Sequence, residues 1–391
     1  MRVFLIAGEA SGDKLGAALM QGLKALRPDV SFDGVGGPLM QAEGLVSRFP
    51  MDELSVMGLA EILPKYRALK ARIRQMADAV LETQPDVLIT IDSPDFCLRV
   101  ARLVKAGSNI RTVHYVAPTV WAWRPKRAAK MAGFIDHVLA LFPFEPPLMQ
   151  AEGMACDFVG HPVVAEPVAD DAQAAALGQG TVVLVLPGSR KGEVSRLADR
   201  FGEAAALVAA SVPDAQFVVP TTANVHDLVT ARVAHWNVPV TVLPPDSPDK
   251  RAWFKRADVA IAASGTVSLE LAAAGTPMVI AYDMAWLSRV IISRMLMVDT
   301  VTLVNLVSET RAVPEFIGEA CQPAPIAAAM LEVLANPHAQ QDAMASTMAR
   351  LGQGGEDPGL RAAKAVLAGL EGLAAEDQQP AGQNRETGIG A

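Results

Sequence analysis

The sequence has few cysteines and no excess of positive charge, and each scarcity excludes a class of protein. Its cysteines are too few and too far apart for a disulfide framework or a zinc site. They number three, at positions 97, 156 and 321, and favour a reducing cytoplasm. The formal net charge of −8 at pH 7 argues against a general nucleic-acid-binding protein, because such a protein needs a basic face to displace counterions from phosphates.

Long uncharged apolar runs are also lacking. Even the apolar segment 278–298 is interrupted by charged residues, so no stretch of about 18 residues is suited to cross a bilayer. The N-terminal segment reaches Glu9 too soon for the apolar region and cleavage site of a signal peptide. We therefore expect no membrane span, and residues 3–7 are predicted to form a first buried strand.

Apolar residues make up 51% of the 391 residues, so the chain can bury large cores, and its length suggests two domains. Short apolar runs alternate with segments of helical spacing, which is typical of parallel α/β sheets. Strands are predicted at 3–7, 86–91, 112–116, 137–142, 181–186, 216–219, 240–243, 259–262 and 278–282. The predicted fold class is α/β, with two facing Rossmann-like domains and a cleft between them.

A proline-rich interruption at 159–170 marks the boundary between the two domains. It predicts an N-terminal acceptor domain over 1–163 and a C-terminal donor domain over 164–350. Residues 351–374 are predicted to form a C-terminal helix. The tail 375–391 is polar and lacks large apolar residues, so it is predicted to be disordered.

The segment 257–283 reads as strand, small-residue turn, helix and strand. Ser264, Gly265 and Thr266 form the turn, where free N–H groups of a helix N-terminus and the absence of bulky side chains suit a diphosphate. Glu270 lies one helical turn further and can accept hydrogen bonds from the hydroxyls of a ribose. An ordinary capped helix is the alternative interpretation.

A second loop, PGSRKGE at 187–193, also follows a predicted strand and precedes a helix. Its Arg190 offers planar donors for bidentate contact with phosphate oxygens. A surface loop with two basic residues remains the alternative.

Asp92 follows the predicted strand 86–91, at the sheet edge where open α/β folds place ligands. We interpret it as a general base. Helix capping competes with that role, since Asp and Ser before a proline are common N-terminal signals, and Asp95 fits a cap better than Asp92.

Apolar residues recur at helical spacing over 59–76, where basic residues also crowd. Such a basic amphipathic helix most often packs on its own sheet with its charges solvated. Contact with a membrane surface is the alternative, and it gains weight if the substrate is a lipid.

Taken together, the motifs resemble the lipid-A-disaccharide synthases, the family-19 glycosyltransferases with the GT-B fold. The resemblance rests on several blocks in one order: AGEASGD at 7–13, VMGLAEILP at 56–64, IDSPDF at 91–96, HYVAPTVWAWRP at 114–125, FVGHP at 158–162, LPGSRKGEV at 186–194 and ASGTVSLE at 263–270.

The resemblance implies inverting transfer of 2,3-diacylglucosamine from its UDP donor to the 6-hydroxyl of 2,3-diacylglucosamine 1-phosphate. Asp92 would be the catalytic base and Arg190 would bind the UDP phosphates. The implied donor site comprises Gly188, Ser189, Arg190, Glu193, Ser264, Gly265, Thr266, Glu270 and Asn305. The implied acceptor site comprises Glu9, Ser11 and Asp13.

The same resemblance implies no cofactor and no nucleic-acid partner, and peripheral contact with the cytoplasmic face of the inner membrane. No carboxylate cluster at metal-binding spacing lies near these loops, so no metal is expected. A homodimer is left open. The sequence departs from the family pattern at 308–311 and at Gly318, in the region that follows the implied donor residue Asn305. A UDP-GlcNAc 2-epimerase-like isomerase and a non-catalytic nucleotide-sugar sensor are the alternative functions.

Overall fold

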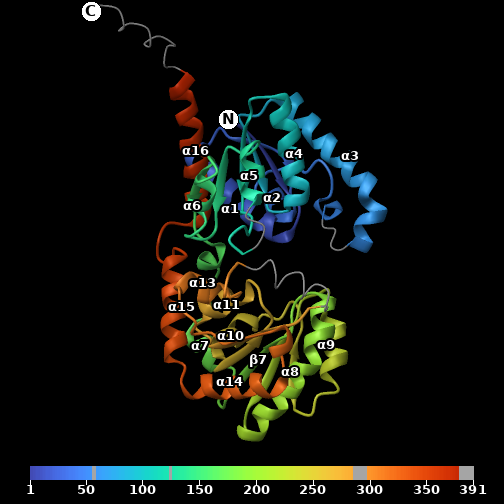
Figure 1. Ribbon diagram of the computed structural model, residues 1–391, viewed down its shortest axis with the longest axis vertical. Coiled ribbons are helices and arrows are strands. Elements are labelled where there is room, and N and C mark those ends of the chain that lie inside the picture. Colours follow the sequence, from blue (N-terminus) through green and yellow to red (C-terminus); the bar gives the residue numbers. More distant parts are fainter. Residues whose placement is uncertain (55–58, 123–125, 285–296, 378–391) are drawn as a thin grey trace, which may run out of the picture. The chain divides into compact units, whose positions relative to one another are not determined.

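The computed structural model describes residues 1–54, 59–122, 126–284 and 297–377, with the side chains outside 59–66 and 373–377. The chain divides into two compact units (Figure 1). Unit 1 comprises Met1–Pro118, Lys126–Gly160 and Glu356–Ala391, and unit 2 comprises Thr119–Pro125 and His161–Gly355. The end of the chain thus returns to unit 1.

Unit 1 is built on a parallel sheet with strand order β2-β1-β3-β4-β5-β6. Its strands are β1 (Arg2–Ala7), β2 (Ser31–Val35), β3 (Val87–Ile91), β4 (Arg111–Tyr115), β5 (His137–Ala140) and β6 (Ala155–Phe158). Its helices are α1 (Ala10–Leu26), α2 (Pro38–Ala42), α3 (Leu59–Thr83), α4 (Pro94–Gly107), α5 (Lys126–Ala132), α6 (Pro146–Gln150) and α16 (Pro358–Asp377), with a 3₁₀ turn at Met51–Glu53.

The terminal helix α16 packs against α1, and their backbones come unusually close (Figure 1). A Cβ built on Gly22 of α1 would lie 2.7 Å from the Gly359 carbonyl oxygen of α16. Arg361 of α16 also donates to the Phe158 carbonyl oxygen of β6 at 2.7 Å and lies over the Phe158 ring. Residues more than 300 positions apart in sequence therefore build one face of unit 1.

Unit 2 repeats the architecture, with strand order β12-β11-β10-β7-β8-β9 in a second parallel sheet. Its strands are β7 (Val182–Leu186), β8 (Gln216–Pro220), β9 (Val240–Leu243), β10 (Val259–Ala262), β11 (Met278–Tyr282) and β12 (Glu315–Ile317). Its helices are α7 (Asp171–Ala175), α8 (Lys191–Ser211), α9 (His226–Val233), α10 (Lys250–Arg256), α11 (Val267–Ala274), α13 (Leu303–Ser308), α14 (Pro323–Ala335) and α15 (His338–Arg350), with 3₁₀ turns at Pro162–Ala165 and Gly318–Ala320.

Both faces of the unit 2 sheet are buried, which explains why its central strands are continuous apolar runs. Val183 and Val185 of β7 contribute to a core with Phe201 of α8 and Met330 of α14. Leu184 of β7, which points to the opposite face, is also fully buried. The alternation of strand and helix and the parallel sheet in each unit confirm the predicted α/β class with two Rossmann-like domains.

Candidate active site

In unit 1 the predicted catalytic residue lies where the strand order reverses. The neighbouring strands β1 and β3 run parallel in register, with Ala7 opposite Ile91, while the chain turns to opposite sides of β1 for β2 and β3. The carboxyl ends of such neighbours are where open α/β sheets bind ligands. Glu9 and Asp92 follow these two strand ends, and the Ser11 hydroxyl donates to Asp92 Oδ2 at 3.5 Å.

The loop that carries Asp92 has a strained backbone. Asp92 and Ser93 both have positive φ angles, 50° and 40°, in the left-handed region that residues other than glycine rarely adopt. The Asp92 N–H donates to the Tyr115 carbonyl oxygen at 2.9 Å, which fixes the loop to β4. Gly8 gives the loop room, since a Cβ there would lie 2.5 Å from Ser93 Oγ. Surrounding contacts therefore hold the half-buried Asp92 in place.

Asp13, predicted to line the acceptor side, serves the backbone of unit 1. Its side chain is buried and accepts hydrogen bonds from the N–H groups of Gly37, Leu39 and Met40 at 2.8–3.0 Å. These are the groups that the N-terminus of α2 leaves without helical partners. The carboxylate thus holds the β2–α2 loop, and its predicted role toward the acceptor stays a prediction.

Unit 2 places its two predicted phosphate loops at its own reversal of strand order. β7 and β10 are neighbours, with Leu186 opposite Ala262, and the chain leaves them for opposite edges of the sheet. The loop 187–190 follows β7 and the turn 264–266 follows β10. The predicted donor residues of these two loops therefore share one edge of one sheet.

Glu193 organises the loop after β7. Its Oε2 accepts hydrogen bonds from the N–H groups of Ser189 and Arg190, at 3.2 and 3.3 Å, and its Oε1 accepts from Arg190 Nη1 at 3.0 Å. Gly188 has φ +114°, and a Cβ there would lie 2.6 Å from Glu193 Oε2. The Arg190 side chain is 62% exposed, so its guanidinium is tethered on one side and open to solvent on the other.

The turn after β10 leads into α11. Gly265 has φ +139° and Thr266 is exposed, while Ser264 is half-buried. Within the described chain, the N–H groups of Gly265, Thr266 and Val267 have no hydrogen-bond acceptor, as expected at a helix N-terminus. A small-residue turn with free N–H groups and a partial positive charge suits an anion.

Glu270 lines a cavity of about 380 Å³ within unit 2, here called the unit 2 cavity. Phe254 of α10, Ala273 of α11 and the loop 245–248 after β9 form other parts of its wall. The sequence motifs did not reveal this loop, although PPDSPD at 244–249 follows a predicted strand and so lies at the ligand-binding edge of the sheet.

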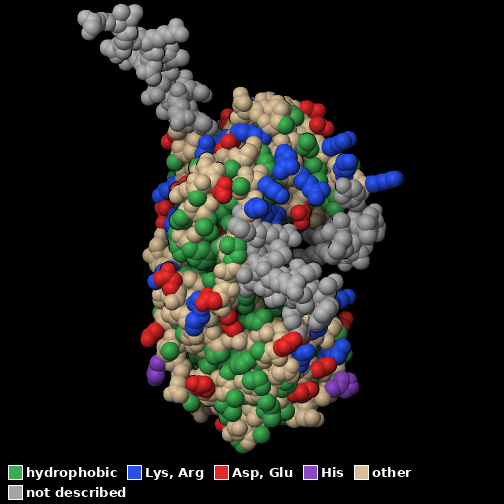
Figure 2. Space-filling view, viewed as in Figure 1, with side chains coloured by type: hydrophobic (Ala, Val, Ile, Leu, Met, Phe, Trp, Pro, Cys, Tyr) green, Lys and Arg blue, Asp and Glu red, His purple; other side chains and the backbone are tan. Residues whose placement is uncertain are grey.

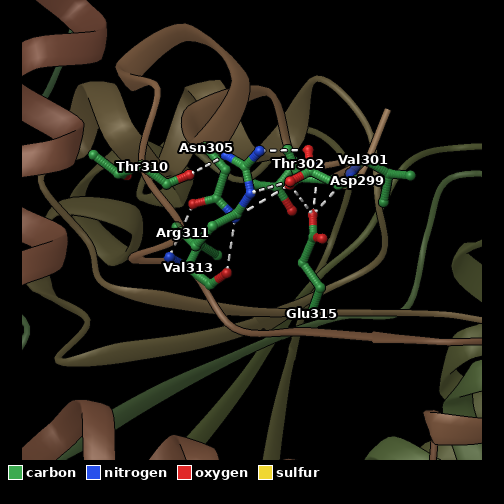
Figure 3. Close-up of polar contacts among 9 residues, drawn as sticks. Asp299, Val301, Thr302, Asn305, Thr310, Arg311, Val313 and Glu315 are labelled. Carbon is green, nitrogen blue, oxygen red and sulfur yellow. Dashed lines mark hydrogen bonds and ion pairs between the residues drawn. The ribbon is translucent and has the colours of Figure 1, made fainter. Parts of the chain in front are cut away.

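Asn305, predicted as a donor contact, is buried and pins a loop of unit 2 (Figure 3). Its Nδ2 donates to the Val313 carbonyl oxygen at 2.9 Å and its Oδ1 accepts from the Val313 N–H at 3.0 Å. Glu315 accepts from the N–H groups of Val301 and Thr302 at 3.0 and 2.6 Å, next to the start of α13. Asn305 therefore shapes this region through the backbone.

Burial raises the pKa of Tyr282, at the end of β11, and the nearby Glu193 carboxylate adds to the rise.

Among the described residues, no three His, Cys, Asp or Glu side chains are grouped as a metal ion would require. In the described part of the chain, no helix combines the length and the apolar character needed to span a bilayer.

Comparison with known proteins gives the family. The family model of lipid-A-disaccharide synthetase matches residues 3–366. A lipid-A-disaccharide synthase from Ruegeria pomeroyi is 62% identical over 385 residues, covering 95% of this chain and 96% of the relative. The enzyme of that name from Rhodospirillum centenum is 47% identical over 376 residues, covering 93% and 94%. The resemblance found in the sequence motifs is confirmed.

Solved structures show the same fold at low identity. UDP-GlcNAc 2-epimerase from Neisseria meningitidis, bound to UDP-GlcNAc, is 12% identical with a TM-score of 0.61, covering 95% of this chain and 100% of that one. MurG from Acinetobacter baumannii is 15% identical with a TM-score of 0.56, covering 95% and 99%. The chain belongs to the lipid-A-disaccharide synthetase family and is a UDP-sugar-dependent glycosyltransferase with the GT-B fold.

Proposed function

We propose that the protein transfers 2,3-diacylglucosamine from its UDP donor to the 6-hydroxyl of 2,3-diacylglucosamine 1-phosphate, with inversion at the anomeric carbon. The products are lipid A disaccharide 1-phosphate and UDP. The observation that carries the proposal is Asp92, a carboxylate held in a strained loop at the reversal of strand order in unit 1.

In this proposal unit 2 binds the donor. Arg190 pairs with the diphosphate, since its guanidinium is exposed beyond its contact with Glu193. The free N–H groups of the turn 264–266 bind phosphate oxygens. Glu270 accepts hydrogen bonds from the ribose hydroxyls, and the uracil enters the unit 2 cavity beside Phe254. A cavity of about 380 Å³ is of the size that small-molecule sites have.

The chemistry assigns distinct work to the two units. The acceptor 6-oxygen forms a bond to the anomeric carbon while the bond from that carbon to the UDP oxygen breaks, through an oxocarbenium-like state. Asp92 takes the proton of the 6-hydroxyl, and Ser11 keeps the carboxylate oriented through its hydrogen bond. Arg190 and the N-terminus of α11 stabilise the charge that grows on the departing UDP.

Incubation with both acylated substrates tests the proposal, with UDP release followed continuously and products identified by mass spectrometry. We expect UDP and disaccharide 1-phosphate in equal amounts. Asp92→Asn should lose about 10²–10⁴-fold in turnover and keep its affinity for UDP, because the amide holds a hydroxyl but cannot accept its proton. Turnover within about tenfold of the parent would remove Asp92 as the base.

The alternative of a 2-epimerase is favoured by one observation, the similarity in fold to solved UDP-GlcNAc 2-epimerases. An epimerase needs no lipid acceptor and acts on soluble UDP-GlcNAc alone. Incubation with UDP-GlcNAc followed by a search for UDP-ManNAc separates the two functions. A nucleotide-sugar sensor would bind UDP-sugar and release no UDP in either experiment.

The acylated substrates reside in a membrane, so we further propose that unit 1 contacts the cytoplasmic face of the inner membrane through α3. Arg67 and Arg74 of this helix are exposed, and with Arg48 they line a surface groove of about 750 Å³. Asp78 and Glu82 lie in the same groove. Exposed basic side chains at this density favour anionic headgroups.

A further inference from the structure

Unit 1 contains a second cavity, of about 300 Å³, which has no part in the catalytic scheme above. This unit 1 cavity is lined by Glu9 after β1, by Ser93 next to Asp92, and by side chains of α3 and the first turns of α4. It therefore opens beside the loops that carry the proposed base and the predicted acceptor residues.

The wall of the unit 1 cavity is apolar on two sides. Leu69 and Ile73 of α3 contribute one side, and Phe96 of α4 contributes the other. Ile73 and Phe96 are only 8% and 6% exposed, so the cavity reaches into the core of unit 1. Such a wall is suited to the methylenes of an acyl chain.

Two cations and a second carboxylate, Asp95, complete the wall. Lys70 of α3 and Arg99 of α4 both line the unit 1 cavity, and neither has an ion pair within the described part of the chain. Their neighbour Arg72 differs, because its guanidinium pairs with Glu53 at 2.8 Å and lies 4.4 Å from the centre of the Phe49 ring. Figure 2 shows basic side chains in the region of α3 and α4. The fold thus engages Arg72 and leaves Lys70 and Arg99 for a ligand.

Ser93, which lines the same cavity, carries a buried hydroxyl. Ser93 Oγ finds no hydrogen-bond partner among the described residues. A buried polar atom without a partner costs free energy unless a ligand or water satisfies it. Its left-handed backbone, with φ 40°, shows that the surrounding structure imposes this position.

We propose that the unit 1 cavity binds the phosphate-bearing end of the acceptor, with the phosphate paired with Lys70 and Arg99. The first methylenes of an acyl chain pack against Leu69, Ile73 and Phe96. A phosphate monoester next to an alkyl chain matches the part of the wall where two cations without ion pairs among the described residues adjoin apolar side chains, although the carboxylates Glu9 and Asp95 line the same cavity. A guanidinium binds phosphate oxygens in bidentate fashion. The inference rests on the proposed function, because it names how that acceptor is selected.

The test measures binding of two soluble probes by calorimetry, short-chain 2,3-diacylglucosamine 1-phosphate and the same compound without its phosphate. The parent should bind the phosphorylated probe at least about tenfold more tightly than the other. Arg99→Gln and Lys70→Gln should each reduce that preference by about tenfold, and leave affinity for the unphosphorylated probe and for UDP unchanged. Both side chains are exposed, so melting temperatures should also be unchanged.

Arg74→Gln is the matched control, because it removes a charge from α3 one turn beyond Lys70 and lies outside the cavity. It should keep the preference of the parent. An equal preference in the parent, Arg99→Gln and Lys70→Gln would overturn the proposal, as would a parent that binds neither probe or an equal loss in Arg74→Gln.

Failure of the subsite and failure of the proposed function give different results. If the parent releases UDP with the full-length substrates while the two variants keep the phosphate preference, transfer stands and the subsite is wrong. If the preference depends on Lys70 and Arg99 while the parent releases no UDP, the subsite stands and the proposed function is wrong.

Discussion

At the scale of single residues, Glu193 explains why the loop after β7 has its sequence. One carboxylate oxygen holds two backbone N–H groups and the other holds Arg190. The same carboxylate leaves no room for a side chain at Gly188. The glycine, the arginine and the glutamate of this motif are therefore one structural unit, and the guanidinium is positioned before any phosphate arrives.

Arg190→Ala should weaken UDP binding by about 1.5–3 kcal/mol, because a charge-assisted bidentate contact is lost and the exposed site offers no replacement. Calorimetry with UDP measures the change. Arg232→Ala is the control, since it removes a charge from unit 2 at an exposed pair with Asp199. Equal UDP affinity in the parent and a folded Arg190→Ala protein would remove Arg190 from the site.

His114 in β4 makes folding stability depend on pH. Burial lowers its pKa to about 3, the nearby Arg127 adds to the effect, and the Thr90 hydroxyl lies 2.8 Å from its Nδ1. The folded pKa lies below the unfolded value of 6.5, so between these values only the unfolded chain binds the proton. Stability contributed by the neutral form is therefore lost as pH falls below 6.5.

From pH 7 to pH 5 this linkage should lower the free energy of unfolding by about 2 kcal/mol. His114→Asn has no titrating ring and should lose correspondingly less over the same range, as measured by denaturant unfolding at each pH. Equal losses in the two proteins would mean that His114 is protonated in the folded state.

The sequence predicted the positions of the candidate site residues but not the hydrogen-bond partner of each side chain. Asp92 and Arg190 were singled out because they follow strand ends, and the structure places them there. Asp13 and Asn305 matched site positions of the family, yet both bind backbone groups in the fold. Their partners, Gly37 and Val313, are set by tertiary packing, so the sequence pattern alone does not reveal them. Their roles toward substrate stay predictions.

At the scale of elements, the central strands were predicted and three edge strands were missed. β2 and β6 form the edges of the first sheet and β12 forms one edge of the second. None is a continuous apolar run: β2 is buried only at its end, β6 at a single residue, and β12 is half-buried throughout. Central strands are covered on both faces, which is why their pattern is readable.

The last helical region shows a similar limit. The sequence predicts a C-terminal helix over 351–374, whereas in the structure α16 begins at Pro358, and breaks separate α14, α15 and α16. Pro337 and Pro358 lie at the breaks, in keeping with the inability of proline to continue a helix. The packing of α16 on α1 in unit 1 could not be predicted, because a contact across more than 300 residues has no local signal.

The crossing of α1 and α16 should be sensitive to a single methyl group. Gly22→Ala places a Cβ 2.7 Å from a backbone oxygen and 2.9 Å from Ala363 Cβ, so we expect a loss of about 1–3 kcal/mol in the stability of unit 1. Gly372→Ala on α16 meets no atom within 4 Å and should gain up to about 1 kcal/mol from helix propensity. Thermal unfolding of both variants measures the two effects, and a Gly22→Ala protein as stable as Gly372→Ala would contradict the close packing.

Helix α3 should carry the contact with membranes. The double variant Arg67→Gln, Arg74→Gln should co-sediment less with anionic vesicles, because each basic residue near such a surface contributes about 1 kcal/mol. Binding of the parent should fall as salt rises. Removing two charges from unit 2, with Arg232→Gln and Lys255→Gln, is the matched control. Equal sedimentation of the two double variants would show that the basic residues of α3 do not contribute to vesicle binding.

At the scale of the whole molecule, predicted site residues of both units lie at the carboxyl ends of the strands where the strand order reverses. The strand order reverses once in each sheet, and the predicted base and the predicted phosphate loops follow the strands at those two reversals. Sheet topology thus explains why motif blocks spread from 7 to 270 supply residues to ligand-binding strand ends. The order of these blocks along the chain is sufficient to indicate the family, whereas the two cavities arise only when the chain folds and distant segments meet.

The linkage of the product tests the central claim most directly. A base at Asp92 that activates the 6-hydroxyl for direct attack requires inversion, so an α-linked UDP donor should give a β-linked disaccharide joined through the 6-oxygen. Proton NMR of the purified product reports both the anomeric configuration and the position of the linkage. We predict a β linkage to the 6-position as the sole product. An α linkage, attachment at another hydroxyl, or conversion of the donor without any disaccharide would contradict the account.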